Sequence, residues 1–226
     1  MIRQEIKMPF KVLSLSDVLV EFIYSPRISA RFSEVDFVIG CGDLPHYYLE
    51  YVVTTLNIPL YYVRGNHSNV IEYTSVGTRT EPHGAVDVHR KVISHQGLLL
   101  AGVEGCLRYR AGPYLYSQAD MWRFVFGLIP GLLRNRIAFG RYLDIFISHA
   151  PPWGIHDQPD LPHQGIKAFR WLLAVFRPAY HFHGHIHVYR PDTVTHTQFH
   201  DTQVINAYGF VETILDPGVL KQWGTV

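Results

Sequence analysis

A chain of 226 residues is long enough to bury a complete hydrophobic core, and we expect one domain spanning residues 1–226. Hydrophobic residues make up 47% of the chain and charged residues 17%, a composition that excludes an intrinsically disordered protein. The formal net charge of +1 provides no broad basic field, which argues against tight binding to a nucleic-acid backbone. A small anionic substrate, such as a nucleotide, remains compatible with this charge.

The N-terminal segment carries Glu5 and Lys7 where a secretory signal needs an uninterrupted apolar core, so we do not expect export. Cys41 and Cys106 each lie beside glycine in an apolar stretch, which favours small buried residues over a disulfide. The longest apolar stretch, residues 124–133, is too short to span a bilayer. These features predict a cytoplasmic protein without a transmembrane segment.

The first third of the chain shows the β-α-β pattern of a parallel sheet. A segment with apolar residues at helical spacing, 45–56, separates two of its predicted strands. Three short apolar runs, typical of buried strands, each end just before a polar residue: 12–16 before Asp17, 37–40 before Asp43 and 59–63 before Asn66. Because ligands gather at the carboxyl ends of parallel strands, we expect these three polar residues to share one edge of the sheet.

The remainder predicts a second sheet that begins within residues 86–103, which contain two or three strands. Ser117 and Asp120 are typical of a helix start, and the apolar pattern predicts a helix over 121–133. The elements expected after it are a strand 142–148 ending at His149, a helix 163–176, a strand 180–183 before Gly184-His185-Ile186-His187, and closing antiparallel strands 193–200, 203–208 and 211–215.

The residue types at these strand ends suit a metal site. A single histidine is more often structural than a ligand, but His185 and His187 lie two apart after Gly184, a spacing that can present the two rings to neighbouring ions. Carboxylates, an amide oxygen and imidazoles together favour borderline divalent metals such as Mn, Fe, Zn or Ni.

Five blocks occur in order at the ends of predicted strands. They are Asp17, Gly42-Asp43, Gly65-Asn66-His67, Ser148-His149-Ala150-Pro151-Pro152 and Gly184-His185-Ile186-His187. Together and in this order, the blocks resemble those of the calcineurin-like metallophosphoesterase family, and the resemblance extends from Asp17 to His187.

The resemblance implies a two-sheet β-sandwich flanked by helices, a four-layer αββα fold. It also implies hydrolysis of a phosphomonoester or phosphodiester by water held between two divalent metal ions about 3.5–4 Å apart. Asp43 would bridge the ions, Asp17 and His187 would bind the first, and Asn66, His149 and His185 would bind the second. His67 would donate a proton to the leaving oxygen or stabilise charge on the phosphoryl group, with orientation of a neighbouring ligand as the alternative role.

One position departs from the family pattern. The family's first block is usually Asp-x-His, whereas this chain has Asp17-Val18-Leu19, and leucine cannot bind a metal. We therefore expect the first metal site to be weak. His46, three residues after Asp43, is a candidate replacement, although a histidine at a helix start is more often exposed or capping.

The segment 108–141 is locally basic, and its helix is apolar almost all round. A solvated charged face is the simpler interpretation of the arginines, and a core or dimer contact is the simpler interpretation of residues 121–129. Contact with an anionic substrate or with a membrane is the alternative, and a peripheral lipid-phosphate hydrolase is one resulting hypothesis. A non-catalytic metal-binding interaction module is another, because of Leu19. The basic residues are Arg108, Arg110, Arg123, Arg134, Arg136 and Arg141, accompanied by Asp120 as the single acidic residue.

Overall fold

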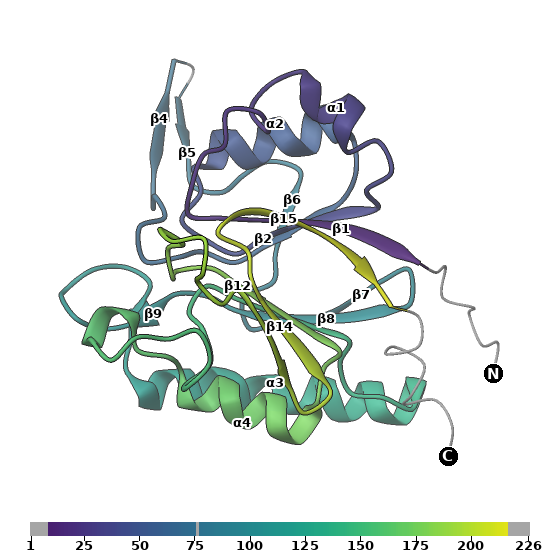
Figure 1. Ribbon diagram of the computed structural model, residues 1–226, viewed down its shortest axis with the longest axis vertical. Helices are drawn as coiled ribbons and strands as arrows, with labels where there is room; N and C mark the ends of the chain where they lie inside the picture. The colour runs from purple at the N-terminus through teal and green to yellow at the C-terminus, as the bar shows by residue number, and fades with distance from the viewer. Residues whose placement is uncertain (1–8, 76, 217–226) are drawn as a thin grey trace.

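The computed structural model describes residues 9–75 and 77–216. Glu5 and Lys7, on which the prediction about export rests, lie outside the described residues. Two β-sheets pack face to face, and a pair of helices covers the outer face of each sheet (Figure 1). The predicted four-layer αββα fold is therefore confirmed.

The first sheet has five strands in the order β15-β1-β2-β3-β6. Strands β1, β2, β3 and β6 are parallel, and β15 runs antiparallel to β1 at one edge. Helices α1 (Arg27–Arg31) and α2 (His46–Leu56) cover its outer face. The strands are β1 (Phe10–Ser16), β2 (Phe37–Gly40), β3 (Leu60–Tyr62), β6 (Ala85–Asp87) and β15 (Gly209–Leu215).

The second sheet has six strands in the order β13-β14-β12-β11-β8-β7. Its four central strands are parallel, and the two edge strands are antiparallel to their neighbours. Helices α3 (Gln118–Phe139) and α4 (Lys167–Phe176) cover its outer face. The strands are β7 (Val92–His95), β8 (Leu98–Val103), β11 (Ile145–Ser148), β12 (Tyr180–His183), β13 (His196–Phe199) and β14 (Thr202–Asn206).

Several short elements outside the two large sheets were not predicted. The hairpin of β4 (Glu72–Thr74) and β5 (Gly77–Arg79) stands away from the body of the molecule (Figure 1). Strands β9 (Cys106–Leu107) and β10 (Leu115–Tyr116) pair in parallel around the loop 108–114, and a single 3₁₀ turn, η1, spans Leu161–His163.

Alternation along the strands divides the core into three apolar layers. Val12 and Phe37 face the space between the sheets, whereas Leu13 and Val38, next to them in sequence, pack beneath α1 and α2. On the second sheet, Phe146 packs against the α3 and α4 layer. Both sheets are thus buried on both faces, as near-continuous apolar strands predict.

Helix α3 is longer than expected. Ser117 forms the predicted capping box with Asp120, but the helix continues past Leu133 to Phe139 and ends at Gly140, which has a positive φ of 77°. Pro130 inside a helix removes one backbone hydrogen bond. The helix tolerates this loss because residues on both sides of Pro130, including Leu128 and Leu132, are buried against the second sheet.

Three further boundaries or pairings differ from the prediction. Helix α4 begins at Lys167 instead of residue 163, because Gln164 and Ile166 have extended backbone. Strand β6 belongs to the first sheet, where it pairs with β3. The closing strands are not one antiparallel group, since β14 pairs in parallel with β12 and β15 crosses to the first sheet to pair with β1.

Cys41 and Cys106 are both buried and free, which confirms the expectation of small core residues. No helix in residues 9–75 and 77–216 has the length and apolar character that crossing a bilayer requires. The cytoplasmic location and the single domain over 1–226 stay predictions.

Asp144, immediately before β11, joins the central strands of the second sheet. Its buried carboxylate accepts hydrogen bonds from the Leu99 backbone N–H at 2.8 Å and from Arg141 Nε at 2.7 Å. We expect Asp144→Ala to lower the free energy of unfolding by about 3 kcal/mol, because it leaves a mostly buried guanidinium and a buried N–H without an acceptor.

Urea denaturation measures this loss, and Asp192→Ala is the matched control. Asp192 pairs with Arg190 at an exposed site, where an ion pair contributes at most about 1 kcal/mol. Equal losses in the two variants would show that the Asp144 network does not stabilise the sheet.

Candidate metal centre

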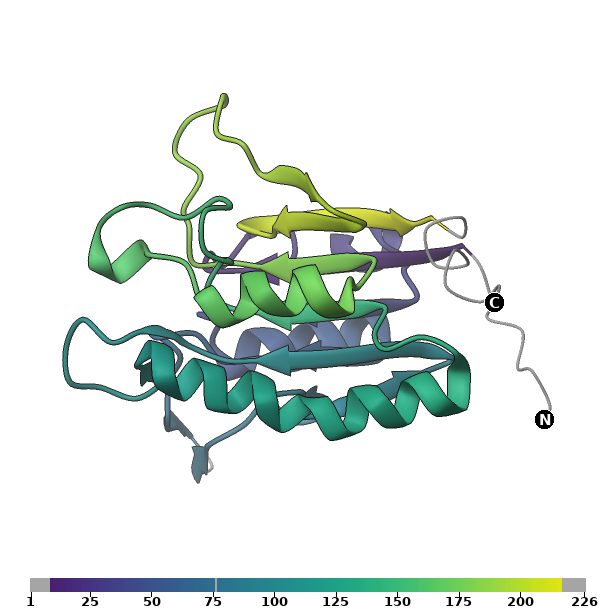
Figure 2. The same cartoon turned by 90° about the horizontal axis from the view of Figure 1, so that it is seen from below.

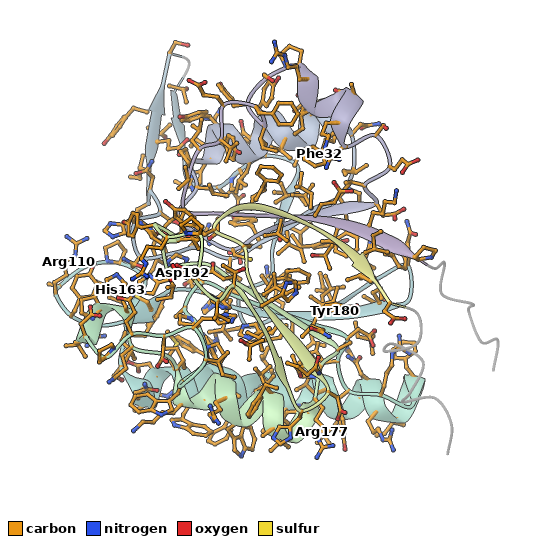
Figure 3. All side chains as sticks on the ribbon, in the orientation of Figure 1. Phe32, Arg110, His163, Arg177, Tyr180 and Asp192 are labelled. Carbon is orange, nitrogen blue, oxygen red and sulfur yellow. The ribbon has the colours of Figure 1, made fainter. Side chains whose placement is uncertain are left out.

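The polar blocks of the sequence come together at one end of the molecule. Loops that follow the carboxyl ends of β1, β2, β3, β11 and β12 carry them, and these strands are parallel within their sheets. Figure 3 shows the side chains of Arg110, His163 and Asp192 at this end, while Arg177 lies at the far end of α4. Asp17, Asp43 and Asn66 therefore share one edge of the first sheet, as predicted. The histidines that follow β11 and β12 of the second sheet lie at the same end of the molecule.

Asp17 directly follows β1 and binds the turn after β12. Its two carboxylate oxygens accept the backbone N–H of His185 at 3.2 and 2.9 Å. Oδ1 of Asp17 lies 3.7 Å from Nε2 of His187. Asp17 therefore fixes the position of the turn that carries both histidines.

Asp43 lies in the loop after β2 and contacts the loop after β3. Its Oδ1 accepts the backbone N–H of His67 at 2.7 Å, and its Oδ2 lies 3.2 Å from Nε2 of His149. Ser68 Oγ accepts the backbone N–H groups of Asp43 at 3.2 Å and of Gly65 at 2.9 Å. This serine joins the two loops behind the carboxylate.

His149 and Asn66 form the buried part of the centre. Nδ1 of His149 donates to the Cys41 carbonyl at 2.8 Å, which directs Nε2 to Asn66 Oδ1 at 3.0 Å and to Asp43. The Asn66 amide donates to the hydroxyl of Tyr109 at 3.3 Å. Asn66 is thereby oriented with its oxygen toward His149 and its nitrogen toward the loop 108–114.

His185 and His187 differ in their environments. His185 is buried, its Nε2 donates to the Pro162 carbonyl at 2.7 Å, and its ring centroid lies 4.8 Å from that of His149. This hydrogen bond leaves Nδ1 of His185 as the nitrogen available to a ligand. His187 is more exposed, and its Nδ1 shares a hydrogen bond with Tyr189 at 2.7 Å.

Strained backbone and two glycines allow the ligand-type side chains to approach one another closely. Asp17, Asp43 and His185 all have positive φ, at 64°, 56° and 69°, a conformation that is costly for such residues and clusters at functional sites. A Cβ at Gly65 would overlap the Asp43 carboxylate and the His149 ring, and one at Gly184 would overlap Asp17. The glycines of the sequence blocks are therefore required for the ligands to meet.

The electrostatics of the centre favour added positive charge. Burial of His149 disfavours its charged form, but the Asp43 and Asp17 carboxylates outweigh burial and raise the pKa of His149. Burial of Asp43 is likewise outweighed by His149 and by the N–H of His67, which lower the pKa of Asp43. Burial and the nearby His149 lower the pKa of His185, which favours the neutral imidazole that binds metals.

The donor set fits a divalent cation. One ligand atom each from Asp17, Asp43 and His149 lies within 4.8 Å of the other two. Two carboxylates in a largely buried pocket need compensating charge, and a cation can replace the proton that His149 holds. Oxygen and imidazole nitrogen donors suit a borderline metal ion.

The sequence profile of the calcineurin-like phosphoesterase family matches residues 10–189. This chain belongs to the calcineurin-like phosphoesterase family. The match includes every ligand-type residue from Asp17 to His187, so the resemblance seen in the sequence is confirmed.

Solved structures share the fold of this calcineurin-like phosphoesterase. The protein TT1561 of Thermus thermophilus has a TM-score of 0.59 at 14% identity, covering 92% of this chain and 100% of the other. Phosphopantetheinyl hydrolase (PptH) from Mycobacterium tuberculosis has a TM-score of 0.56 at 11% identity, covering 92% and 97%. At these identities the likeness shows the fold alone. A search of curated proteins found no significant match.

The structure also places Leu19, which stands where the family usually has a histidine, and the two candidate residues His46 and His67. Leu19 is partly buried and packs against the apolar layer beneath α1 and α2. His46 is 2% exposed at the start of α2 and lines a small cavity with Gly42 and Arg64, outside the group formed by Asp17, Asp43 and His149. The replacement of the family's missing ligand by His46 therefore stays a prediction. His67 is exposed and tied to Asp43 through its backbone.

Several contacts of this candidate metal centre had no signal in the sequence. Tyr109 reaches Asn66, Tyr189 reaches His187, and the Pro162 carbonyl orients His185. His163 lies with its ring 5.4 Å from that of His185. These residues come from loops and from the short 3₁₀ turn η1, and only the folded chain brings them to the strand ends.

Proposed function

We propose that this chain is a metal-dependent hydrolase of phosphate esters that acts through the centre built on Asp17, Asp43 and His149. The observation that carries the proposal is the convergence of these three ligand atoms within 4.8 Å at the carboxyl ends of strands from both sheets. Membership of the chain in the calcineurin-like phosphoesterase family supports hydrolysis of a phosphate ester as the reaction class.

Two divalent cations are proposed, with Asp43 shared between them. One ligand atom of Asp43 lies within 4.8 Å of a ligand atom of Asp17 and of one of His149, which supports this role. Asp17 is in turn 3.7 Å from Nε2 of His187, and Nε2 of His149 is 3.0 Å from Asn66 Oδ1. The first position would use Asp17, Asp43 and His187. The second would use Asp43, Asn66, His149 and His185.

Cations bound there would polarise phosphoryl oxygens and lower the pKa of a shared water, the chemistry that two-metal sites supply. The chain's own residues hold the proposed ligands in place. Tyr109 holds the Asn66 amide at 3.3 Å, and Ser68 fixes the backbone of Asp43, so that neither ligand needs to reorganise when substrate binds.

His67 is the proposed proton donor to the leaving oxygen. Its backbone N–H is held by Asp43 at 2.7 Å, whereas its side chain is exposed and accessible to a substrate. Histidine is the side chain that enzymes use most often as a general acid. The attachment of His67 to the shared carboxylate supports this role, because it keeps the imidazole beside the metal centre.

A second candidate function is a non-catalytic metal-binding module on the same fold, favoured by the packing of Leu19 where the family usually has a ligand. One screen separates the two. Purified protein is assayed with Mn, Fe, Ni, Zn and Mg against generic phosphomonoesters, phosphodiesters and nucleotides, with metal content measured in parallel. Turnover that depends on a cation supports the hydrolase, and bound metal without turnover of any ester supports the module.

We expect unequal occupancy of the two metal positions. The first has three proposed protein ligands and the second has four, so protein purified without added metal should hold fewer than two equivalents. Activity should then rise as a divalent cation is titrated in, because the two-ion reaction needs both charges. Elemental analysis and a titration of turnover measure this, and two tightly held equivalents with flat activity would show that another group completes the first site.

A further inference from the structure

The outer layer formed by α3 and α4 has a surface that phosphate-ester hydrolysis does not explain. The two helices lie side by side across one face of the molecule (Figure 2). Their inner sides are buried against the second sheet, through residues such as Val125 and Leu172. Their outer sides carry large apolar side chains among the polar residues that are typical of a surface helix.

We call this row of side chains the α3/α4 stripe. On α3 the spacing of its residues places them on one side of the helix. Phe126 is 51% exposed, Leu133 48% and Ile137 84%. The stripe consists of Trp122, Phe126, Leu133 and Ile137 from α3, with Trp171 and Val175 from α4.

Aromatic contacts join the two helices at one end of the stripe. The ring centroids of Trp122 and Trp171 lie 5.5 Å apart, and Phe126 lies 5.6 Å from Trp171. A surface groove beside them is lined by Trp153, Lys167 and further residues. Tryptophan with an accessible face beside cationic side chains is typical of a bilayer interface.

Positive charge borders the stripe. The two helices contain five basic residues and one acidic residue, Asp120, which already caps α3 and pairs with Arg123. Arg134 and Lys167 are exposed, and the Lys167 ammonium lies 4.7 Å from the Trp153 ring centroid. The five basic residues are Arg123, Arg134, Arg136, Lys167 and Arg170.

From this combination we infer that the α3/α4 stripe is a docking surface for an anionic lipid bilayer. The apolar and aromatic side chains enter the interfacial region, and the surrounding cations contact acidic headgroups. The charge argues against a second copy of the chain as the occupant, because two such faces would bring ten basic side chains together with two acidic ones. This inference does not depend on the proposed hydrolysis.

Co-sedimentation of the purified chain with lipid vesicles tests the inference. Vesicles of phosphatidylcholine with phosphatidylserine are expected to bind the protein in a salt-sensitive manner, and vesicles of phosphatidylcholine alone are not. Failure to bind the anionic vesicles at low salt would overturn the inference. So would sedimentation velocity showing a dimer that substitutions in the stripe dissociate.

Two variants separate the charged and apolar contributions. Arg134→Gln with Lys167→Gln is expected to weaken vesicle binding about 25-fold, at about fivefold for each charge. Phe126→Ser with Ile137→Ser is expected to weaken it about tenfold or more. All four side chains are exposed, so folding should be retained and can be verified by circular dichroism.

Matched controls lie on other faces. Arg27→Gln with Arg31→Gln removes the same charge from α1, in the opposite layer, and Tyr73→Ser with Ile214→Ser removes exposed apolar groups from β4 and β15. These controls should bind vesicles like the unaltered chain. Equal losses in control and stripe variants would show that no specific surface is involved.

Discussion

Asp43→Ala is expected to abolish phosphate-ester hydrolysis and to reduce metal content at both positions. Asp43 lies 3.2 Å from His149 and holds the His67 loop, and it is the single proposed ligand common to the two ions. Its loss removes a charge that each cation needs and leaves His149 without its acidic partner. Elemental analysis and turnover with the best substrate of the cation screen measure the two effects.

Asp192→Ala, which removes an exposed carboxylate paired with Arg190, is the control and should leave both quantities unchanged. Near-normal metal content and turnover in Asp43→Ala would remove Asp43 from the centre. Loss of one equivalent alone would show that Asp43 binds a single ion.

His67→Ala is expected to lower kcat about 10²–10⁴-fold while metal content stays unchanged, the loss typical of a general acid. The contact of His67 with Asp43 uses the backbone N–H, which alanine retains. The loss should shrink for an ester whose leaving group needs no proton, so comparison of alkyl and nitrophenyl esters separates proton donation from positioning.

His83→Ala, another exposed histidine, is the control for this substitution. Unchanged kcat in His67→Ala would leave His67 with a positioning role only. If His163→Ala instead caused the loss, the proton donor would be His163, whose ring lies beside that of His185.

The site was predictable because parallel strands place their carboxyl ends at one edge. Asp17, Asp43 and Asn66 follow strands of the first sheet, and His149 follows a strand of the second. Each could be located from a short apolar run and the polar residue after it. The burial of Cys41 and Cys106 as free cysteines was also predictable, because both lie in apolar stretches of the sequence.

Other features depend on contacts between distant segments. The local rule for proline ends α3 near Pro130, but burial of Leu132 against the sheet extends the helix to Phe139. The positive φ of Asp17 and the reach of Tyr109 to Asn66 have no local sequence signal, because both are imposed by loops that meet in the folded chain. Leu19 was identified as a departure from the family, but its packing beneath α1 and α2 required the structure.

The exposure of the α3/α4 stripe could not be predicted from the sequence. The apolar run 121–129 favoured a core or dimer contact in the sequence, and its inner half does pack against the sheet. Phe126, however, is 51% exposed beside Trp171. Sequence alone could not assign the outer half, because α4 joins it only in the folded structure.

The central claim is that cations held by Asp17, Asp43 and His149 drive hydrolysis of a phosphate ester. The most direct test measures turnover of one ester by a single protein sample before chelation, after chelation and after metal is restored, with metal content determined at each stage. We expect turnover to fall with the metal and to return with it. Turnover that persists in metal-free protein, or metal that returns without turnover of any ester, would contradict the claim.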